Sequence, residues 1–227
     1  MSRVLTVAEM TLRETSRRRG VLAILLVFPL CFYLARRGDF AGQSIRFVCL
    51  GLGWALSTAA LFAGNANRDL ETRLRLTGYR PAQLWAGRLL ALWAVGVLLS
   101  VPYFLLVLFD QPGVRHGAIG LIMLVMVAVS VPFGLAISAV LPRELEGTLI
   151  LLTIVGLQMV MDPASPAARA LPFWFSREIA TYAIDHTDSG YLDRGLLHGA
   201  VVAVTMVALV AIATGVRLRR RPHLRFG

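Results

Sequence analysis

The chain has 227 residues, of which 57% are hydrophobic and only 16% are charged, with a mean hydropathy of +0.69. Soluble domains are about 45–50% apolar and about 25% charged, so this composition excludes an ordinary soluble fold and indicates an integral membrane protein. All 23 basic residues are arginine, and without the lysine that a P-loop uses to contact nucleotide phosphates the chain cannot be a self-contained ATPase of that class.

Residues 1–19 have the pattern of an amphipathic helix. One face of this helix would carry Val4, Val7, Ala8 and Leu12, and polar residues would cover the opposite face. We expect an interface helix that lies on the cytoplasmic surface of the membrane. A secretory or twin-arginine signal is disfavoured, because Glu9 and Glu14 precede the first apolar run and no small-residue cleavage site follows it.

Six apolar segments are candidates to cross the membrane, which requires roughly 20 residues each. The first and the fifth are short, but flanking arginines can snorkel and a bilayer can thin locally. We therefore predict an all-α integral membrane protein in which residues 1–227 form one transmembrane domain. The predicted spans are 20–35, 47–67, 81–109, 116–142, 145–163 and 195–216.

The arginines predict the orientation of these spans, because short cytoplasmic loops carry the excess of positive charge. With the N-terminus inside, 16 arginines are cytoplasmic and 7 are external, while the acidic residues divide 6 and 7. The net charge of +10 then faces the cytoplasm, where it suits anionic lipid rather than nucleic acid. We expect both termini to be cytoplasmic and the chain to lie in a bacterial-type inner membrane.

A polar segment, "RDLETRLRLTGYRPAQLWAGR" at residues 68–88, separates the second and third spans. Asp69–Arg73 and Glu71–Arg75 are both i,i+4 pairs with the acid first, which is the favourable order on a helix. Gly78 is a plausible helix end, and Pro81 is a plausible first residue of the next helix. We predict a short helix, a tight turn and the entry of the third span.

Two further connections differ in length. The segment 141–148, "LPRELEGT", is short and predicted to be cytoplasmic, whereas 162–194 is long and predicted to be external. The long segment should contain one or two short helices dipping into the outer leaflet, with Phe173, Trp174 and Phe175 at the headgroup level.

This layout resembles the permease subunit of ABC-2 type exporters. That family has an N-terminal interface helix, six spans, a coupling helix between spans two and three, and re-entrant helices between spans five and six. Glu71, the stretch at 74–81 and the Gly87–Arg88 pair stand where the family has a glutamate, a proline-led turn and a "GK" pair, so Arg88 replaces the family's lysine. The segment 144–147 resembles the second cytoplasmic connection.

The resemblance implies a membrane subunit that is not itself catalytic and binds no cofactor, with ATP and Mg²⁺ held by two separate ABC ATPase subunits. It also implies a second permease subunit, identical or similar, and contact of the chain with membrane lipid. The residues implied to couple to the ATPase are Asp69, Leu70, Glu71, Arg73, Leu74, Arg75, Gly78, Arg80 and Pro81, with a second contact at Arg143, Glu144 and Glu146.

Other functions fit the sequence less well. An ion-driven transporter usually places charged residues inside its spans. Within the six segments, the stretches 20–35, 47–67, 89–109, 116–142, 147–161 and 195–216 contain no Asp, Glu or Arg. An intramembrane protease would need a G-x-S-G element with a histidine, or H-E-x-x-H, and neither is present. A haem-exporter permease of cytochrome c maturation has a similar layout and remains the alternative, and a structural or immunity-type membrane partner is also open.

Residues on a substrate path are harder to identify from the sequence. Small and polar residues in the second and fifth spans could line one, namely Ser57, Thr58, Asn65, Gln158 and Met159, but close helix packing explains small residues equally well. Because the span interiors lack charge, we expect an amphipathic or lipid-like cargo.

Overall fold

The computed structural model describes residues 2–38, 41–66, 68–141, 143–162 and 165–218. The predicted ends of three spans, at 67, 142 and 163, lie outside these ranges, and so do four C-terminal arginines counted above (Arg219, Arg220, Arg221 and Arg225). The described part of the chain is helical and contains no strand, so the all-α prediction is confirmed.

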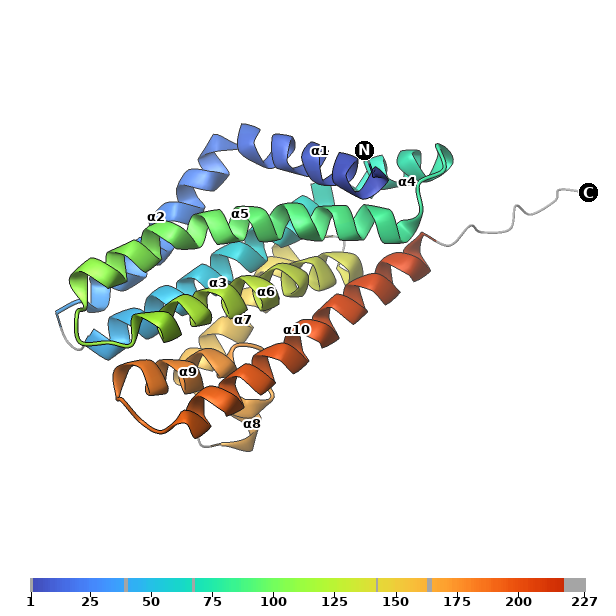
Figure 1. Cartoon of the computed structure of the whole chain (residues 1–227). Coiled ribbons are helices and arrows are strands. Elements are labelled where there is room, and N and C mark those ends of the chain that lie inside the picture. Colours follow the sequence, from blue (N-terminus) through green and yellow to red (C-terminus); the bar gives the residue numbers. More distant parts are fainter. Residues whose placement is uncertain (1, 39–40, 67, 142, 163–164, 219–227) are drawn as a thin grey trace, which may run out of the picture.

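The helices follow the predicted order along the chain (Figure 1). They are α1 (Arg3–Arg17), α2 (Arg19–Arg36), α3 (Ala41–Ala66), α4 (Arg68–Leu76), α5 (Pro81–Asp110), α6 (His116–Val140), α7 (Glu144–Val160), α8 (Pro166–Arg169), α9 (Trp174–Ile184) and α10 (Ser189–Arg217).

Four helices are long and apolar enough to cross a membrane: α3, α5, α6 and α10. A fifth candidate is α1 together with α2, which are bent by 71° with respect to each other. The predicted fifth span corresponds to α7, which has 17 residues and at 1.5 Å per residue is about 25 Å long, shorter than a hydrocarbon core of about 30 Å. By length and composition the structure therefore supports four or five spans, rather than all six.

The centre of the bundle is the contact between α3 and α6. A side chain on Gly134 of α6 would begin 2.0 Å from the Ser57 carbonyl oxygen, and one on Gly64 of α3 would begin 2.1 Å from the Ser138 hydroxyl. The two backbones can approach this closely only because glycine has no side chain at these positions. The Ser57 hydroxyl donates a hydrogen bond of 3.0 Å to the Ser130 carbonyl across the same contact.

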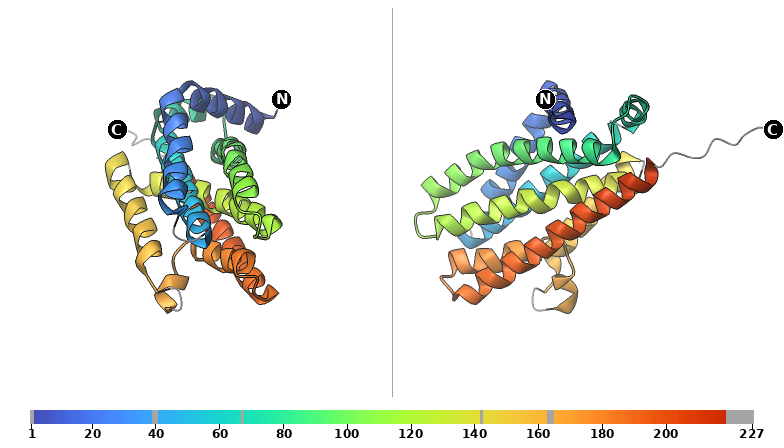
Figure 2. Two further views of the ribbon diagram at one scale, coloured as in Figure 1. Left: turned by 90° about the vertical axis from the view of Figure 1, so that its left-hand side faces the viewer. Right: turned by 45° about the vertical axis from the view of Figure 1, so that its right-hand side comes forward.

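The N-terminal helix α1 lies across the beginning of α5, as Figures 1 and 2 show. The helix is present where the sequence predicts one, with Ser2 as its N-cap. Its buried face consists of Val7, Ala8 and Thr11, whereas Leu12 is 37% exposed. Val7 and Ala8 of the predicted apolar face thus pack on α5 together with Thr11, and the predicted position of α1 on the membrane surface stays a prediction.

The segment before α10 contains the short helices α8 and α9, as expected. The prediction that its aromatic residues lie at the headgroup level is wrong, because Phe173 and Phe175 are fully buried and Trp174 is 8% exposed. Phe173 packs edge-on against Phe133 of α6, with ring centroids 5.8 Å apart. These side chains form part of the protein core.

The two ends of the bundle are clearly different in Figure 1. The beginning of α1, the short helix α4 and the end of α10 gather at one end, and α8 and α9 lie at the other. We call these the α4 end and the α9 end.

Candidate functional site

The helix α4 occupies the polar segment that the sequence singles out. It ends at Leu76, and Gly78 has a φ of +88°, a conformation that residues with a side chain rarely adopt. Pro81 is the first residue of α5, and the backbone N–H of Arg80 donates to the Gln83 side chain at 3.0 Å. The predicted helix, turn and restart are thus confirmed.

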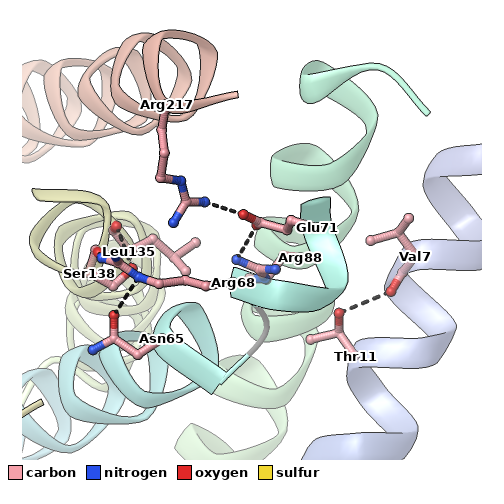
Figure 3. A network of polar contacts seen from close by, with 9 residues as sticks. All are labelled: Val7, Thr11, Asn65, Arg68, Glu71, Arg88, Leu135, Ser138 and Arg217. Carbon is pink, nitrogen blue, oxygen red and sulfur yellow. Dashed lines mark hydrogen bonds and ion pairs between the residues drawn. The ribbon is translucent and has the colours of Figure 1, made fainter. Parts of the chain in front are cut away.

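Glu71 is the centre of a buried ion cluster (Figure 3). One of its carboxylate oxygens lies 2.7 Å from a guanidinium nitrogen of Arg88 on α5, and the other accepts a hydrogen bond from Arg217 at the end of α10. The Glu71 and Arg88 side chains are only 2% and 8% exposed. Buried charges are tolerated when they are paired, so this carboxylate fastens α4 to two long helices at once.

The predicted Glu71–Arg75 pair is therefore wrong. Arg75 donates instead to the carbonyl oxygens of Tyr79, at 3.3 Å, and of Leu218, at 3.2 Å. The second of these bonds connects the end of α4 to the residue after α10. The Asp69 side chain lies outside what the structure describes, so the predicted Asp69–Arg73 pair stays a prediction.

Arg68, the first residue of α4, joins this helix to the α6–α7 connection. It donates to the Asn65 side chain at 3.2 Å and to the Leu141 carbonyl at 3.0 Å, and it also contacts the Ser138 carbonyl. Burial, and secondly the Arg217 charge, lower the pKa of Arg68, while Glu71 acts in the opposite direction. Arg68 thus brings α4 close to the predicted second cytoplasmic contact.

At that second contact, Arg143 forms an exposed ion pair of 2.9 Å with Glu146. Glu144 is the first residue of α7 and is exposed. Exposed pairs contribute little to stability, at most about 1 kcal/mol. All three side chains are accessible at the surface, where a partner protein could contact them.

The exposed side of α4 is partly apolar. Leu70 is 38% exposed and Leu76 is 85% exposed, and Arg73 and Arg80 are also at the surface. Leu74 faces a cavity of about 480 Å³ between α1, α4 and α5, which Val7, Leu70 and Arg88 also line.

The N-terminal helix anchors the turn after α4. Arg3 donates a hydrogen bond of 2.7 Å to the Gly78 carbonyl, and its guanidinium lies 5.4 Å from the centre of the Tyr79 ring. Two residues of this site were not identified from the sequence. Arg217 lies 146 positions from its partner Glu71, and Arg3 lies 75 positions from Gly78, so no local pattern connects either pair.

The residues predicted to line a substrate path do not share one cavity among the described residues. The Ser57 hydroxyl donates its hydrogen bond to Ser130 within the contact between α3 and α6, and the Asn65 side chain accepts a hydrogen bond from Arg68. Thr58 lines a small apolar cavity of about 190 Å³ with Phe28 and Trp54. Gln158 and Met159 line a separate cavity near α9.

A comparison with protein families identifies the class of protein to which the chain belongs. The family model for the ABC-2 family transporter protein matches residues 39–179, which include α3 to α7 and the beginning of α9. A search of curated proteins finds no match. Members of this family are membrane components of transporters, are typically non-catalytic, and generally work with ABC ATPase subunits. Because the match covers more than half of the chain, this multi-pass membrane protein belongs to the ABC-2 transporter family.

Proposed function

We propose that this chain is the permease subunit of an exporter in which a separate ABC ATPase docks on α4, and that Glu71 passes the movement of α4 to α5 and α10. The observation that carries the proposal is the buried Glu71 carboxylate, which contacts Arg88 and Arg217 on two different helices. Such an ion cluster transmits force between helices, because displacing Glu71 alone would leave buried charges unpaired.

The shape of the α4 end supports this proposal. The side of α4 that carries Leu76 is exposed and offers an apolar contact flanked by arginines, as expected of a helix seated on a partner. The cavity of about 480 Å³ beside α4 leaves room for the helix to shift relative to α1. A helix of nine residues is too short to be stable alone, so its position depends on these tertiary contacts.

The proposal extends to the whole assembly. Residues 1–227 form one domain, in which α2, and α7 in a locally thinned bilayer, complete six spans with both termini in the cytoplasm. Two such subunits and two ATPases form the transporter in a bacterial-type inner membrane. The cargo is amphipathic or lipid-like, because the span interiors are apolar, and ATP with Mg²⁺ binds only to the ATPases.

The docking claim is tested by measuring the affinity of the purified chain for its ATPase. Leu76→Asp and Arg73→Glu each place negative charge on the exposed side of α4, and we expect each to weaken binding about tenfold or more, equivalent to about 1.4 kcal/mol. Arg169→Glu is the matched control, because it reverses an exposed charge at the α9 end. Unchanged affinity in both α4 variants would show that the ATPase docks elsewhere.

A further inference from the structure

A second cavity, at the α9 end, has a different chemistry from the site at α4. It has a volume of about 240 Å³ and lies between the beginning of α3, the end of α7 and the beginning of α9. Its lining residues are Gln43, Arg46, Phe47, Leu50, Gln158, Met159, Ser176 and Arg177. The set contains two arginines and no acidic residue, so the lining carries a net positive charge.

The two arginines differ in their partners: Arg46 forms an ion pair of 3.2 Å with Asp185, whereas Arg177 forms no ion pair among the described residues. Arg46 shares its terminal nitrogen between Thr181 and Asp185, each at 3.2 Å, but its buried Nε has no hydrogen-bond partner in the described part of the chain. Glu178, which follows Arg177, is already paired with Arg194 at 3.0 Å. Arg46 therefore keeps one unused donor, its Nε, and Arg177 brings a second guanidinium group to the cavity.

The environment of Arg177 supports the same conclusion. Burial, and secondly the neighbouring Arg46 guanidinium, lower the pKa of Arg177, while Glu178 and Asp162 act in the opposite direction. Desolvation and like charge both make a cation less stable, and an anion placed between the two guanidinium groups would relieve both effects. Arginine is well suited to such a contact, because its planar fork matches phosphate and carboxylate geometry.

A third polar group faces this cavity without a partner. The side-chain amide oxygen of Gln158, Oε1, is buried and has no hydrogen-bond partner among the described residues. This side-chain oxygen is an acceptor, so it would bind a hydroxyl group of a headgroup rather than the anionic oxygens. By contrast, the Ser176 hydroxyl is occupied by the Phe173 carbonyl at 2.8 Å.

The remaining lining is apolar. Phe47, Leu50 and Met159 supply a hydrophobic wall beside the arginines. A cavity slightly below the range of about 300–1,000 Å³ typical of small-molecule sites can hold a headgroup and the first part of a chain. The combination of cationic and apolar walls fits an amphiphile rather than a free ion.

We propose that the cavity formed by Arg46, Gln158 and Arg177 binds the anionic headgroup, a phosphate or carboxylate, of a lipid-like amphiphile. The site rests on the proposed function in that its ligand has the chemistry of the proposed cargo. It lies at the opposite end of the bundle from α4, however, and its binding requires no ATPase, so it can be tested separately.

The test is a binding measurement on the purified full-length chain in uncharged detergent. Short-chain phosphatidylglycerol is the anionic probe, and phosphatidylcholine of the same chain length is the zwitterionic one. We expect phosphatidylglycerol to bind at least tenfold more tightly than phosphatidylcholine. Arg177→Gln and Gln158→Leu should each abolish most of this preference, whereas Arg177→Lys should keep part of it. The matched control Arg169→Gln removes an exposed arginine outside the cavity and should change nothing.

Inorganic phosphate separates an amphiphile site from a plain anion site. We expect phosphate to compete with phosphatidylglycerol only at concentrations at least a hundredfold higher, because it gains nothing from the apolar wall. Competition at equal concentration would overturn the amphiphile part of the proposal. An unchanged preference in both Arg177→Gln and Gln158→Leu would overturn the site itself, and having two variants on different helices guards against one that fails to fold.

Discussion

Glu71 is a single carboxylate shared by two arginines from distant parts of the chain. Its oxygens contact Arg88 and Arg217, and Arg68 lies near enough to be influenced by both Glu71 and Arg217. Removal of Glu71 would leave Arg88 and Arg217 without the carboxylate that pairs with both of them. Among the residues of this site, we expect substitution of Glu71 to disturb the contacts of α4 with α5 and α10 most strongly.

Substitutions of Arg88 test how much this cluster stabilises the fold. Arg88→Met leaves a carboxylate oxygen of Glu71 buried and unpaired, and breaking a buried pair costs about 3–5 kcal/mol. Arg88→Lys keeps the charge and should lose less than half as much. Thermal unfolding of the purified chain measures both, and a melting temperature for Arg88→Met equal to that of the wild type would show that the pair contributes nothing.

At the scale of secondary-structure elements, α1 is held against α5 through a glycine. A side chain on Gly87 would begin 2.6 Å from the Val4 carbonyl oxygen and 2.7 Å from the Val7 side chain. Both neighbours belong to α1, and one is backbone that cannot rotate away. The position of α1 therefore depends on the absence of a side chain at Gly87.

Gly87→Ala should push α1 away from α5 and destabilise the protein by about 1–3 kcal/mol, the usual cost of overpacking. The matched control is Gly156→Ala on α7, where the added carbon would meet nothing within 4 Å. In that control, alanine should be neutral or stabilising by up to about 1 kcal/mol, because it favours helix. Melting temperatures that fall equally in both variants would contradict the close packing of α1 on α5.

The elements that the sequence predicted well are those with local causes. The end of α4 at Gly78 and the start of α5 at Pro81 depend on the conformational preferences of those residues themselves. The i,i+4 rule failed for Glu71, because it offers a few tenths of a kcal/mol and competes with two buried partners far along the chain. Hydropathy also cannot distinguish an aromatic residue that faces lipid from one that faces protein, which is why Phe173 was misplaced.

At the scale of the whole molecule, the long helices divide into central and peripheral ones. We compare the most apolar stretch of 18 residues in each of these helices. About 72% of that stretch is buried inside the protein in α3 and in α6, compared with 33% in α5 and 11% in α10. In a membrane, the exposed apolar faces of α5 and α10 are covered by lipid or by another subunit. The ion cluster around Glu71 joins α4 to these two peripheral helices.

The proposed topology places the α4 end in the cytoplasm and the α9 end outside. In a chain with Cys31→Ser and Cys49→Ala, single cysteines at Arg73 and Ser189 should react with an impermeant thiol reagent from opposite sides of the membrane. We expect Ser189→Cys to react in intact cells, and Arg73→Cys only after permeabilisation. Reaction of both from the same side would exclude this arrangement of helices.

The central claim is that α4 binds the ATPase on one side and drives α5 and α10 through Glu71 on the other. The most direct measurement is permease-dependent ATP turnover by the complex reconstituted with Glu71→Gln, with Glu71→Asp as the conservative variant. We predict that Glu71→Gln lowers this turnover about tenfold per assembled complex, with partial recovery in Glu71→Asp. Wild-type turnover in a Glu71→Gln complex that binds its ATPase normally would contradict the claim.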